Sequence, residues 1–255
     1  MKPAAPEVKL VIDIETVPDT SLPQPEPTEK RPDPFGAPPA WKIVEIGVLS
    51  LVDWQAKRLS ALSTEGGGER GMLERLIDGV QRTKDITLVT WNGRHFDLPV
   101  IAARAMHHGL SWPWYYSRKS VRKRYDNDGH WDINDDIADY GSADRSNLDL
   151  VAKSIGMPGK YSSAHGSKVA EMEAAGQHDL VSRYCLEDVL QTAAIMLRFA
   201  LLRGDLSLDV YRAAAEKLLV SCDEGAPLAE MGKHIDRERF LLPVPALTLM
   251  TQEVA

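Results

Sequence analysis

Two acidic residues, Asp13 and Glu15, end an apolar run and stand two positions apart. Residues two apart on a strand project from the same face, so a strand over 8–15 would place both carboxylates side by side. Neighbouring carboxylates repel each other, and burial in a sheet disfavours their charged forms. A divalent cation would relieve both costs, whereas an acidic strand end that faces water is the structural alternative.

Asp188 is a third candidate, because it belongs to a helix predicted over 177–202. With 3.6 residues per turn, one stripe of this helix should face the sheet. That stripe contains Val181, Tyr184, Asp188, Thr192 and Ile195. Tyr184 precedes Asp188 by about one turn, so the phenol and the carboxylate can reach a common point. A solvated Glu187–Asp188 pair on the outer side of the helix is the alternative.

A fourth acid, Asp97, stands between a predicted strand and a predicted helix. The connection reads Trp91-Asn92-Gly93-Arg94-His95-Phe96-Asp97. Connections of this kind often carry functional side chains. Asp97 is also a reasonable N-cap for the helix that follows it.

Taken together, three segments resemble the exonuclease motifs of the DEDD superfamily, in order and in kind of element. They are Asp13-Ile14-Glu15-Thr16, Asn92-Gly93-Arg94-His95-Phe96-Asp97 and Tyr184-Cys185-Leu186-Glu187-Asp188. A tyrosine four positions before the last aspartate is typical of the DEDDy branch. Within that branch the chain is similar to the stand-alone predicted 3′→5′ exonucleases related to family-B DNA polymerases, through residues 13–18, 91–93, 156–160 and 184–189. The resemblance extends from about Lys9 to Arg203.

This resemblance implies a ribonuclease H-like α/β fold, in which a mixed sheet begins with three meander strands and carries helices on both faces. It also implies that Asp13, Glu15 and Asp188 hold one divalent cation, while Asp13 and Asp97 serve a second, partly through water. Two ions about 3.5–4 Å apart can generate hydroxide and offset the charge that builds during phosphodiester hydrolysis. Oxygen ligands favour Mg²⁺ or Mn²⁺, whereas zinc would want His or Cys, and we expect neither here.

The resemblance further implies that Tyr184 positions the attacking water and ligates no metal. A tyrosine with a pKa of about 10 is a poor base near neutral pH unless its surroundings shift that pKa. Thr16, Asn92 and Phe96 stand where similar exonucleases contact the terminal nucleotides. Phe96 fits equally well in the core, although stacking on a base, worth about 1–3 kcal/mol, would suit an enzyme that moves along a strand.

A basic segment follows the second motif and the aromatic residues at 112–116. Its five cations fall within seven positions: Arg118, Lys119, Arg122, Lys123 and Arg124. In a chain of net charge −7 this density predicts a phosphate-binding surface, with a solvated loop as the alternative. Two further residues match the family: Asp132, expected behind the ligands, and Lys160, either a phosphate contact or part of its loop.

The hydrophobic pattern predicts the elements that would position these residues. Strands are expected over 8–15, 43–52, 57–63 and 86–90, with a hairpin connection at 53–56. Helices are expected over 69–81, 97–108, 147–155, 167–175 and 177–202. Eight prolines between positions 18 and 39 exclude a helix or a central strand there. We therefore divide the chain into an exonuclease domain (1–205) with a proline-rich loop (18–40), and a C-terminal helical extension and tail (206–255).

Composition is that of an ordinary globular protein and excludes collagenous, disulfide-stapled and wholly disordered classes. Because 37 Asp and Glu outnumber 30 Lys and Arg, nucleic acid cannot be bound by bulk charge and must bind locally. Cys185 and Cys222 are expected to be packed, reduced thiols. Since neither a leader peptide nor an uninterrupted apolar span is recognisable, we expect a cytoplasmic protein that binds no membrane.

The function expected from these observations is metal-dependent 3′→5′ exonuclease activity at nucleic-acid 3′ ends, with single-stranded DNA favoured. Two alternatives stay open. One is an exoribonuclease that acts on RNA 3′ ends, because two-metal chemistry needs no 2′-hydroxyl. The other is a non-catalytic nucleic-acid-binding module on the same fold, which the five intact motif positions disfavour.

Overall fold

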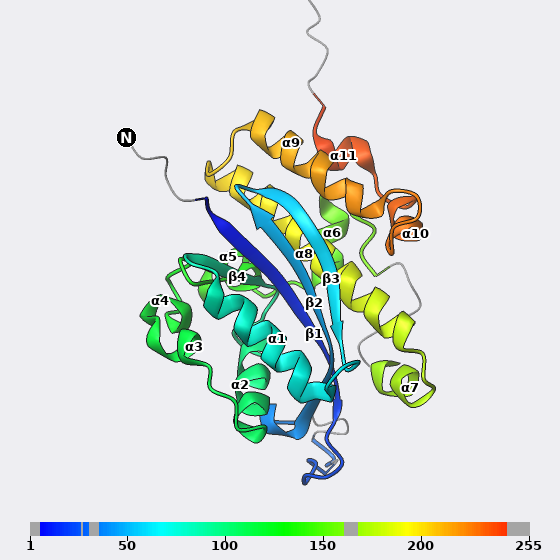
Figure 1. Cartoon of the computed structure of the whole chain (residues 1–255). Helices are drawn as coiled ribbons and strands as arrows, with labels where there is room; N and C mark the ends of the chain where they lie inside the picture. Colours follow the sequence, from blue (N-terminus) through cyan, green and yellow to red (C-terminus); the bar gives the residue numbers. More distant parts are fainter. Residues whose placement is uncertain (1–5, 27, 31–35, 161–167, 244–255) are drawn as a thin grey trace, which may run out of the picture.

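The computed structural model describes residues 6–26, 28–30, 36–160 and 168–243. Among these residues, five strands form one mixed sheet in the order β3-β2-β1-β4-β5 (Figure 1). An antiparallel meander comes first, made of β1 (Val8–Pro18), β2 (Trp41–Val52) and β3 (Gln55–Ser63). The shorter strands β4 (Ile86–Thr90) and β5 (His130–Asp132) then add in parallel to β1. The predicted α/β class with three leading meander strands is confirmed.

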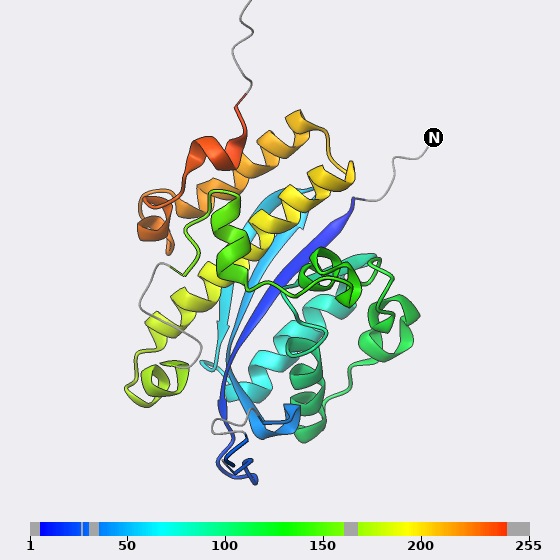
Figure 2. The same cartoon turned by 180° about the vertical axis from the view of Figure 1, so that it is seen from behind.

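Helices cover both faces of this sheet, as Figure 1 and the view from behind in Figure 2 show. The longer ones are α1 (Gly68–Arg82), α2 (Asp97–His107), α6 (Leu148–Ser154), α7 (Val169–Ala174), α8 (His178–Arg203) and α9 (Leu208–Leu219). Short pieces connect them: η1 (Pro38–Ala40), α3 (Pro113–Ser117), α4 (Lys119–Arg122), α5 (Ile133–Ile137), η2 (Asp139–Gly141), η4 (Val220–Cys222), α10 (Ala229–Gly232) and α11 (Arg237–Leu241). Along the described residues, no helix combines the length and the apolar character that crossing a membrane requires.

Alternate residues of β1 face two different apolar cores. Ile12 and Ile14 belong to the core formed with α1 and α2, whereas Val11 belongs to the core formed with α6, α8 and α9. Because side chains alternate along a strand, Asp13 and Glu15 share the face of Val11 and point toward α8. The periodicity of the apolar run therefore predicted the correct face for this pair.

Several strand boundaries differ from the expected ones, including the start of β2, which begins at Trp41. β1 continues to Pro18, because its pairing with β2 resumes after a bulge between Glu15 and Thr16. The connection between β2 and β3 is shorter than expected, since Asp53 and Trp54 both take positive φ (48° and 67°) and close a two-residue turn. Proline at the very end of a strand removes no central ladder bond, which is why β1 can include it.

The C-terminal helices share a core with the rest of the chain. Tyr211, Ala214 and Leu218 of α9 lie in the same apolar cluster as Leu49 of β2 and the inner face of α8. The boundary placed between residues 205 and 206 thus separates segments that pack against each other. It stays a prediction.

A buried ion network anchors the chain where it leaves β1. Arg104 of α2 pairs with Glu69 of α1 at 2.6 Å and with Asp19 at 2.7 Å, and His108 also contacts Glu69 at 2.8 Å. Glu69 in addition accepts a hydrogen bond from the main-chain amide of Ile43 in β2. This network joins α1, α2, β2 and the start of the proline-rich loop at one point.

The close approach of α8 to the sheet depends on Gly47 of β2. A Cβ atom at Gly47 would lie 2.7 Å from Cγ2 of Val189 and 2.9 Å from Sγ of Cys185. The amide of Gly47 also donates a hydrogen bond to that sulfur, at 3.1 Å. Any larger residue would push α8, which carries Tyr184 and Asp188, away from β1.

We expect Gly47→Ala to lower the free energy of unfolding by about 1–3 kcal/mol, because overpacking this contact forces α8 to shift. Chemical denaturation measures the effect. Gly79→Ala is the control, since a Cβ there meets nothing within 4 Å and lies in the middle of α1. It should stabilise the protein by up to about 1 kcal/mol. Equal effects of the two substitutions would contradict this account of Gly47.

Candidate active site

Three elements converge where β1 extends past the end of β4. Among the described residues, β4 pairs with β1 only along Val8–Val11, so the next part of β1 has an edge that no described strand pairs with on that side. α2 begins at Asp97 opposite this edge, and the main-chain amide of Ile14 donates a hydrogen bond to the Asp97 carboxylate. α8 crosses the face of the sheet and brings Asp188 and Tyr184 to the same region. An unpaired strand edge is thus used to hold an acidic side chain.

The structure brings the four predicted acids together, and we call Asp13, Glu15, Asp97 and Asp188 the acid cluster. Burial raises the pKa of Asp13, and the charges of the other three acids raise it further. The pKa of Glu15 is raised in the same way, first by burial and then by Asp188 and Asp97. Asp13 therefore lies within electrostatic range of the other three acids, and Glu15 within range of Asp97 and Asp188, in surroundings that disfavour their negative charges.

Asp97 and Asp188 differ in what offsets the cost of burial. Burial raises the pKa of each to about 7. For Asp97, hydrogen bonds from its own amide and from that of Ile14 oppose the increase, while nearby Asp132 adds to it. For Asp188, the charge of Lys160 and a hydrogen bond from the Tyr184 hydroxyl oppose the increase.

Tyr184 is positioned by packing as well as by that hydrogen bond. It lies in a small apolar cluster with Val44, Val181 and residues of α7. Val44 is the residue of β2 left unpaired by the bulge opposite Glu15 and Thr16, and bulges commonly re-aim side chains beside active sites. The ammonium group of Lys160 lies 5.9 Å from the centre of the Tyr184 ring. The predicted meeting of phenol and carboxylate is confirmed.

Cys185 lies among these acids, contrary to the expectation that no sulfur would stand there. Ligand atoms of Asp13, Glu15 and Cys185 lie within 4.8 Å of one another. Burial raises the pKa of the Cys185 thiol well above its ordinary value, and the neighbouring carboxylates raise it further. The Cys185 thiol donates a weak hydrogen bond to Oδ2 of Asp13, at 3.7 Å, and it is one soft donor beside four hard carboxylates. The preference for hard cations therefore rests on the carboxylates.

Asp97 does not cap its helix, so that interpretation of the sequence was wrong. Phe96 is the N-cap residue and no side chain there accepts a capping hydrogen bond, while Asp97 is the first helical residue. Its carboxylate turns instead toward the open edge of β1. An N-cap and a first-turn acid look alike in sequence, and only the contact with β1 separates them.

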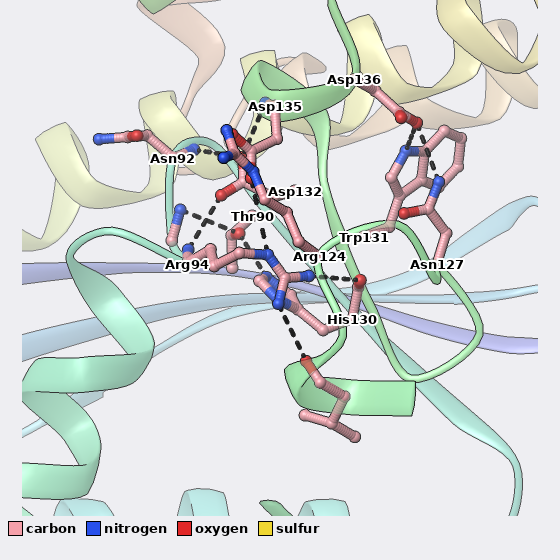
Figure 3. A network of polar contacts seen from close by, with 12 residues as sticks. Thr90, Asn92, Arg94, Arg124, Asn127, His130, Trp131, Asp132, Asp135 and Asp136 are labelled. Carbon is pink, nitrogen blue, oxygen red and sulfur yellow. Dashed lines mark hydrogen bonds and ion pairs between the residues drawn. The ribbon is translucent and has the colours of Figure 1, made fainter. Parts of the chain in front are cut away.

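The loop of the second motif is held from behind by Asp132. Its carboxylate accepts hydrogen bonds from the amides of Asn92 and Arg94, both at 2.9 Å (Figure 3). Asn92 takes a left-handed conformation with φ of 62°, which asparagine tolerates better than most residues. Gly93 is required here, because a Cβ would lie 2.4 Å from Oγ1 of Thr90. Asp132 thus orders the loop that leads into Asp97.

A pocket of about 590 Å³ opens beside Asp13 and Asp97. Asn92 and Phe96 line it, as the predicted substrate contacts should. The Phe96 ring also packs edge-on against Trp41, with ring centres 6.2 Å apart, so it takes part in both the core and the pocket wall. Thr16 follows the bulge in β1 and is not among the described residues that line this pocket.

The family model for predicted 3′-5′ exonucleases related to the exonuclease domain of PolB matches residues 33–235. The chain belongs to this family. Membership makes it an enzyme of the 3′-5′ exonuclease class, and the match includes the second and third motifs. None of the curated proteins compared with the sequence matches it.

Two solved structures resemble the family member described here. The family B DNA polymerase from the hyperthermophilic archaeon Pyrobaculum calidifontis aligns with a TM-score of 0.53 at 18% identity, over 93% of this chain and 29% of the polymerase. A product-bound structure of exonuclease I aligns with a TM-score of 0.48 at 12% identity, over 81% of this chain and 45% of that one. The chain thus spans less than a third of the polymerase, and the likeness concerns the fold.

The basic segment lies apart from the pocket of the acid cluster. None of its five cations is among the described residues that line that pocket. The guanidinium groups of Arg118 and Arg122 lie over the rings of Trp114 and Tyr116, and Lys119 is exposed. Lys123 pairs with Asp126 at 3.8 Å, whereas Arg124 reaches Asp135 near the second-motif loop. A role for this segment in substrate binding stays a prediction.

Two residues near the site were missed by the sequence reasoning. Glu45 lies directly across from Glu15 in the β1–β2 pair, and burial raises its pKa to about 7. A lone glutamate inside the predicted strand over 43–52 was the available signal. Arg145 donates hydrogen bonds to Asn92 and Asp135, and no local pattern marked it.

Asp188→Asn should stabilise the metal-free protein at pH 8. Because the folded pKa of Asp188 is raised, its contribution to stability is present below the unfolded pKa and is lost as pH rises through about 7. The variant should therefore be more stable than wild type by roughly 1–3 kcal/mol at pH 8, and the gain should vanish near pH 4. Urea denaturation in EDTA at the two pH values measures this.

The control for that measurement is Asp179→Asn, which changes an exposed aspartate in the first turn of the same helix. It should alter stability little at either pH. If Asp188→Asn were destabilising at pH 8 in EDTA, the raised pKa of Asp188 would be refuted.

Proposed function

We propose that this chain hydrolyses phosphodiester bonds at the 3′ ends of single-stranded DNA, with divalent cations held by the acid cluster. The convergence of four carboxylates beside one open pocket is the observation that carries the proposal. Asp13 and Asp97 line that pocket. Glu15 and Asp188 lie beside Asp13, as the mutual effects on their pKa values require.

The donor set fits Mg²⁺ or Mn²⁺. Four carboxylates offer hard oxygen ligands, and a bound cation would offset the cost of burial that raises their pKa values. Asp13, Glu15 and Asp188 would hold one ion, and Asp13 with Asp97 the other. When bound, such ions would lower the pKa of a coordinated water and offset charge on the reacting phosphate.

The residues around the acid cluster would orient the substrate and the attacking water. The Tyr184 hydroxyl donates a hydrogen bond to Asp188 while the Tyr184 ring packs in an apolar cluster. The hydroxyl can therefore hold a water beside the carboxylates while the ring stays packed. Lys160 lies next to Tyr184 and close enough to Asp188 and Glu15 to affect their pKa values. Its ammonium group is placed to attract a phosphate, while Asn92 and Phe96 would contact the terminal nucleotide.

We expect Asp188→Asn to reduce Mn²⁺-dependent cleavage at least about 100-fold, since losing a ligand removes several kcal/mol of transition-state stabilisation. The assay uses one single-stranded oligonucleotide labelled at either end. Wild-type protein should release labelled mononucleotide from the 3′ label and shorten the 5′-labelled strand stepwise. Asp179→Asn should cleave like wild type, and retained activity in Asp188→Asn would refute the assignment.

The preference for DNA is tested separately with matched DNA and RNA strands of one sequence. Faster digestion of DNA is expected. Preferential digestion of RNA would overturn the substrate while leaving the nuclease activity intact, and binding without cleavage of either strand would favour the non-catalytic alternative.

Millimolar Mg²⁺ or Mn²⁺ should raise the melting temperature of the wild-type protein. Only the native state gathers the four acids, so a cation present at 100 times its Kd would stabilise that state by about 2.7 kcal/mol. Differential scanning fluorimetry with EDTA, Mg²⁺ and Mn²⁺ measures the shift. Asp188→Asn should reduce it, and an unchanged melting temperature in wild type would count against the proposed metal site.

A further inference from the structure

Three arginines surround one buried carboxylate beside the pocket of the acid cluster. We call Arg94, Arg124 and Arg145 the arginine cluster. All three pair with Asp135, which is 1% exposed. Nε of Arg94 lies 3.6 Å and Nη2 of Arg124 3.0 Å from its oxygens, and Arg145 approaches the same carboxylate. Figure 3 shows the network around Asp135 from close by.

The arginine cluster carries more positive charge than its carboxylate partner can balance. Asp132, whose carboxylate accepts hydrogen bonds from the amides of the second-motif loop, adds one negative charge near Arg124, so two carboxylates stand against three guanidinium groups. Two members reach solvent, since the side chains of Arg124 and Arg145 are 40% and 37% exposed. An excess of exposed guanidinium groups around one buried acid is a natural site for a second anion.

Arg145 links this charge to the acid cluster. One terminal nitrogen donates to Oδ1 of Asn92, which lines the pocket together with Asp13 and Asp97. The residues that follow Arg145 in the chain, Ser146 and Asn147, line the same pocket. Arg145 therefore stands at the rim, where a strand seated in the pocket would pass.

Other cations near this edge are balanced by their own partners. In the neighbouring cavity of about 1050 Å³, Lys123 pairs with Asp126, and Arg203 pairs with both Asp136 and Asp205. Several aspartates line that cavity as well. Arg124 also lines this cavity, but its ion-pair partner is Asp135, which it shares with Arg94 and Arg145, so the positive charge in excess lies at the arginine cluster.

We propose that Arg145, together with Arg124, binds a backbone phosphate of the substrate strand where it leaves the pocket, and that Asp135 holds both guanidinium groups in place. This inference rests on the proposed function and names a contact of the same site. A guanidinium has five N–H donors, more than the contacts with Asn92 and Asp135 use, and its planar fork matches a phosphate. Arg145 would contact the substrate strand directly, at the rim of the pocket.

The test measures DNA binding by Arg145→Gln in an Asp188→Asn background that does not cleave. Fluorescence anisotropy follows a labelled single-stranded oligothymidylate in Mg²⁺ over a range of salt concentrations. We expect about tenfold weaker binding near 0.1 M salt and a salt slope smaller by about 0.7, the value of one phosphate contact on a single strand. In the otherwise wild-type enzyme, Arg145→Gln should raise KM and leave kcat nearly unchanged.

Two variants separate phosphate binding from a purely structural role. Arg145→Lys keeps the charge and should restore the salt slope but only part of the affinity. Arg82→Gln removes an exposed arginine of α1 that pairs only with Asp78 in its own helix, and it should change neither quantity. Weaker binding with an unchanged salt slope would show that Arg145 merely orders its loop and would overturn the inference.

Wild-type behaviour separates this inference from the proposed function. If the wild-type enzyme cleaves DNA but Arg145→Gln binds it with the same Kd and slope, the phosphate site is wrong and the function stands. If the wild-type protein neither binds nor cleaves the strand, the proposed function itself fails.

Discussion

The crowding of four carboxylates, with Glu15 and Asp97 buried and Asp13 and Asp188 half-buried, is the constraint on which the rest of the structure depends. Burial raises the pKa of every member of the acid cluster, and the charges of other members add to the increase at Asp13 and Glu15, so bringing these groups together costs free energy. The fold imposes the arrangement through rigid surroundings. β2 pairs with β1 along its length, Gly47 lets α8 lie close, and the open edge of β1 holds Asp97 by a main-chain hydrogen bond.

Positive charge is distributed around that cluster instead of inside it. Lys160 lies beside Tyr184 and Asp188, whereas Arg145 lies beside Asn92. In a chain of net charge −7 such local groups are what can attract a polyanion. In the strand order of the sheet, β2 and β3 lie on one side of β1, and β4 and β5 lie on the other. Ligands of α/β proteins commonly bind at the point where the strand order reverses in this way.

Much of the fold could be predicted because its signals are local. Alternation along 8–15 placed Asp13 and Glu15 on one face, and 3.6-residue periodicity placed Tyr184 and Asp188 on the inner stripe of α8. The resemblance of the three motifs to those of DEDD exonucleases predicted that these groups would meet. Boundaries were less certain where pairing with a distant strand decided them, as at Pro18 and at the turn after Val52.

The features that the sequence did not predict depend on contacts between residues far apart in the chain. The Asp97 carboxylate accepts a hydrogen bond from the edge of β1 and does not cap its own helix. Cys185 lies among the acids because of how α8 packs on β2. Arg145 contacts Asn92, which is 53 positions away in the chain. No local period encodes such meetings. The sequence alone determined which residues are candidates for the chemistry and which faces of β1 and α8 present them, since neighbours along the backbone define those faces. Only the tertiary structure decided which charges balance one another, because that requires the distances between elements packed together.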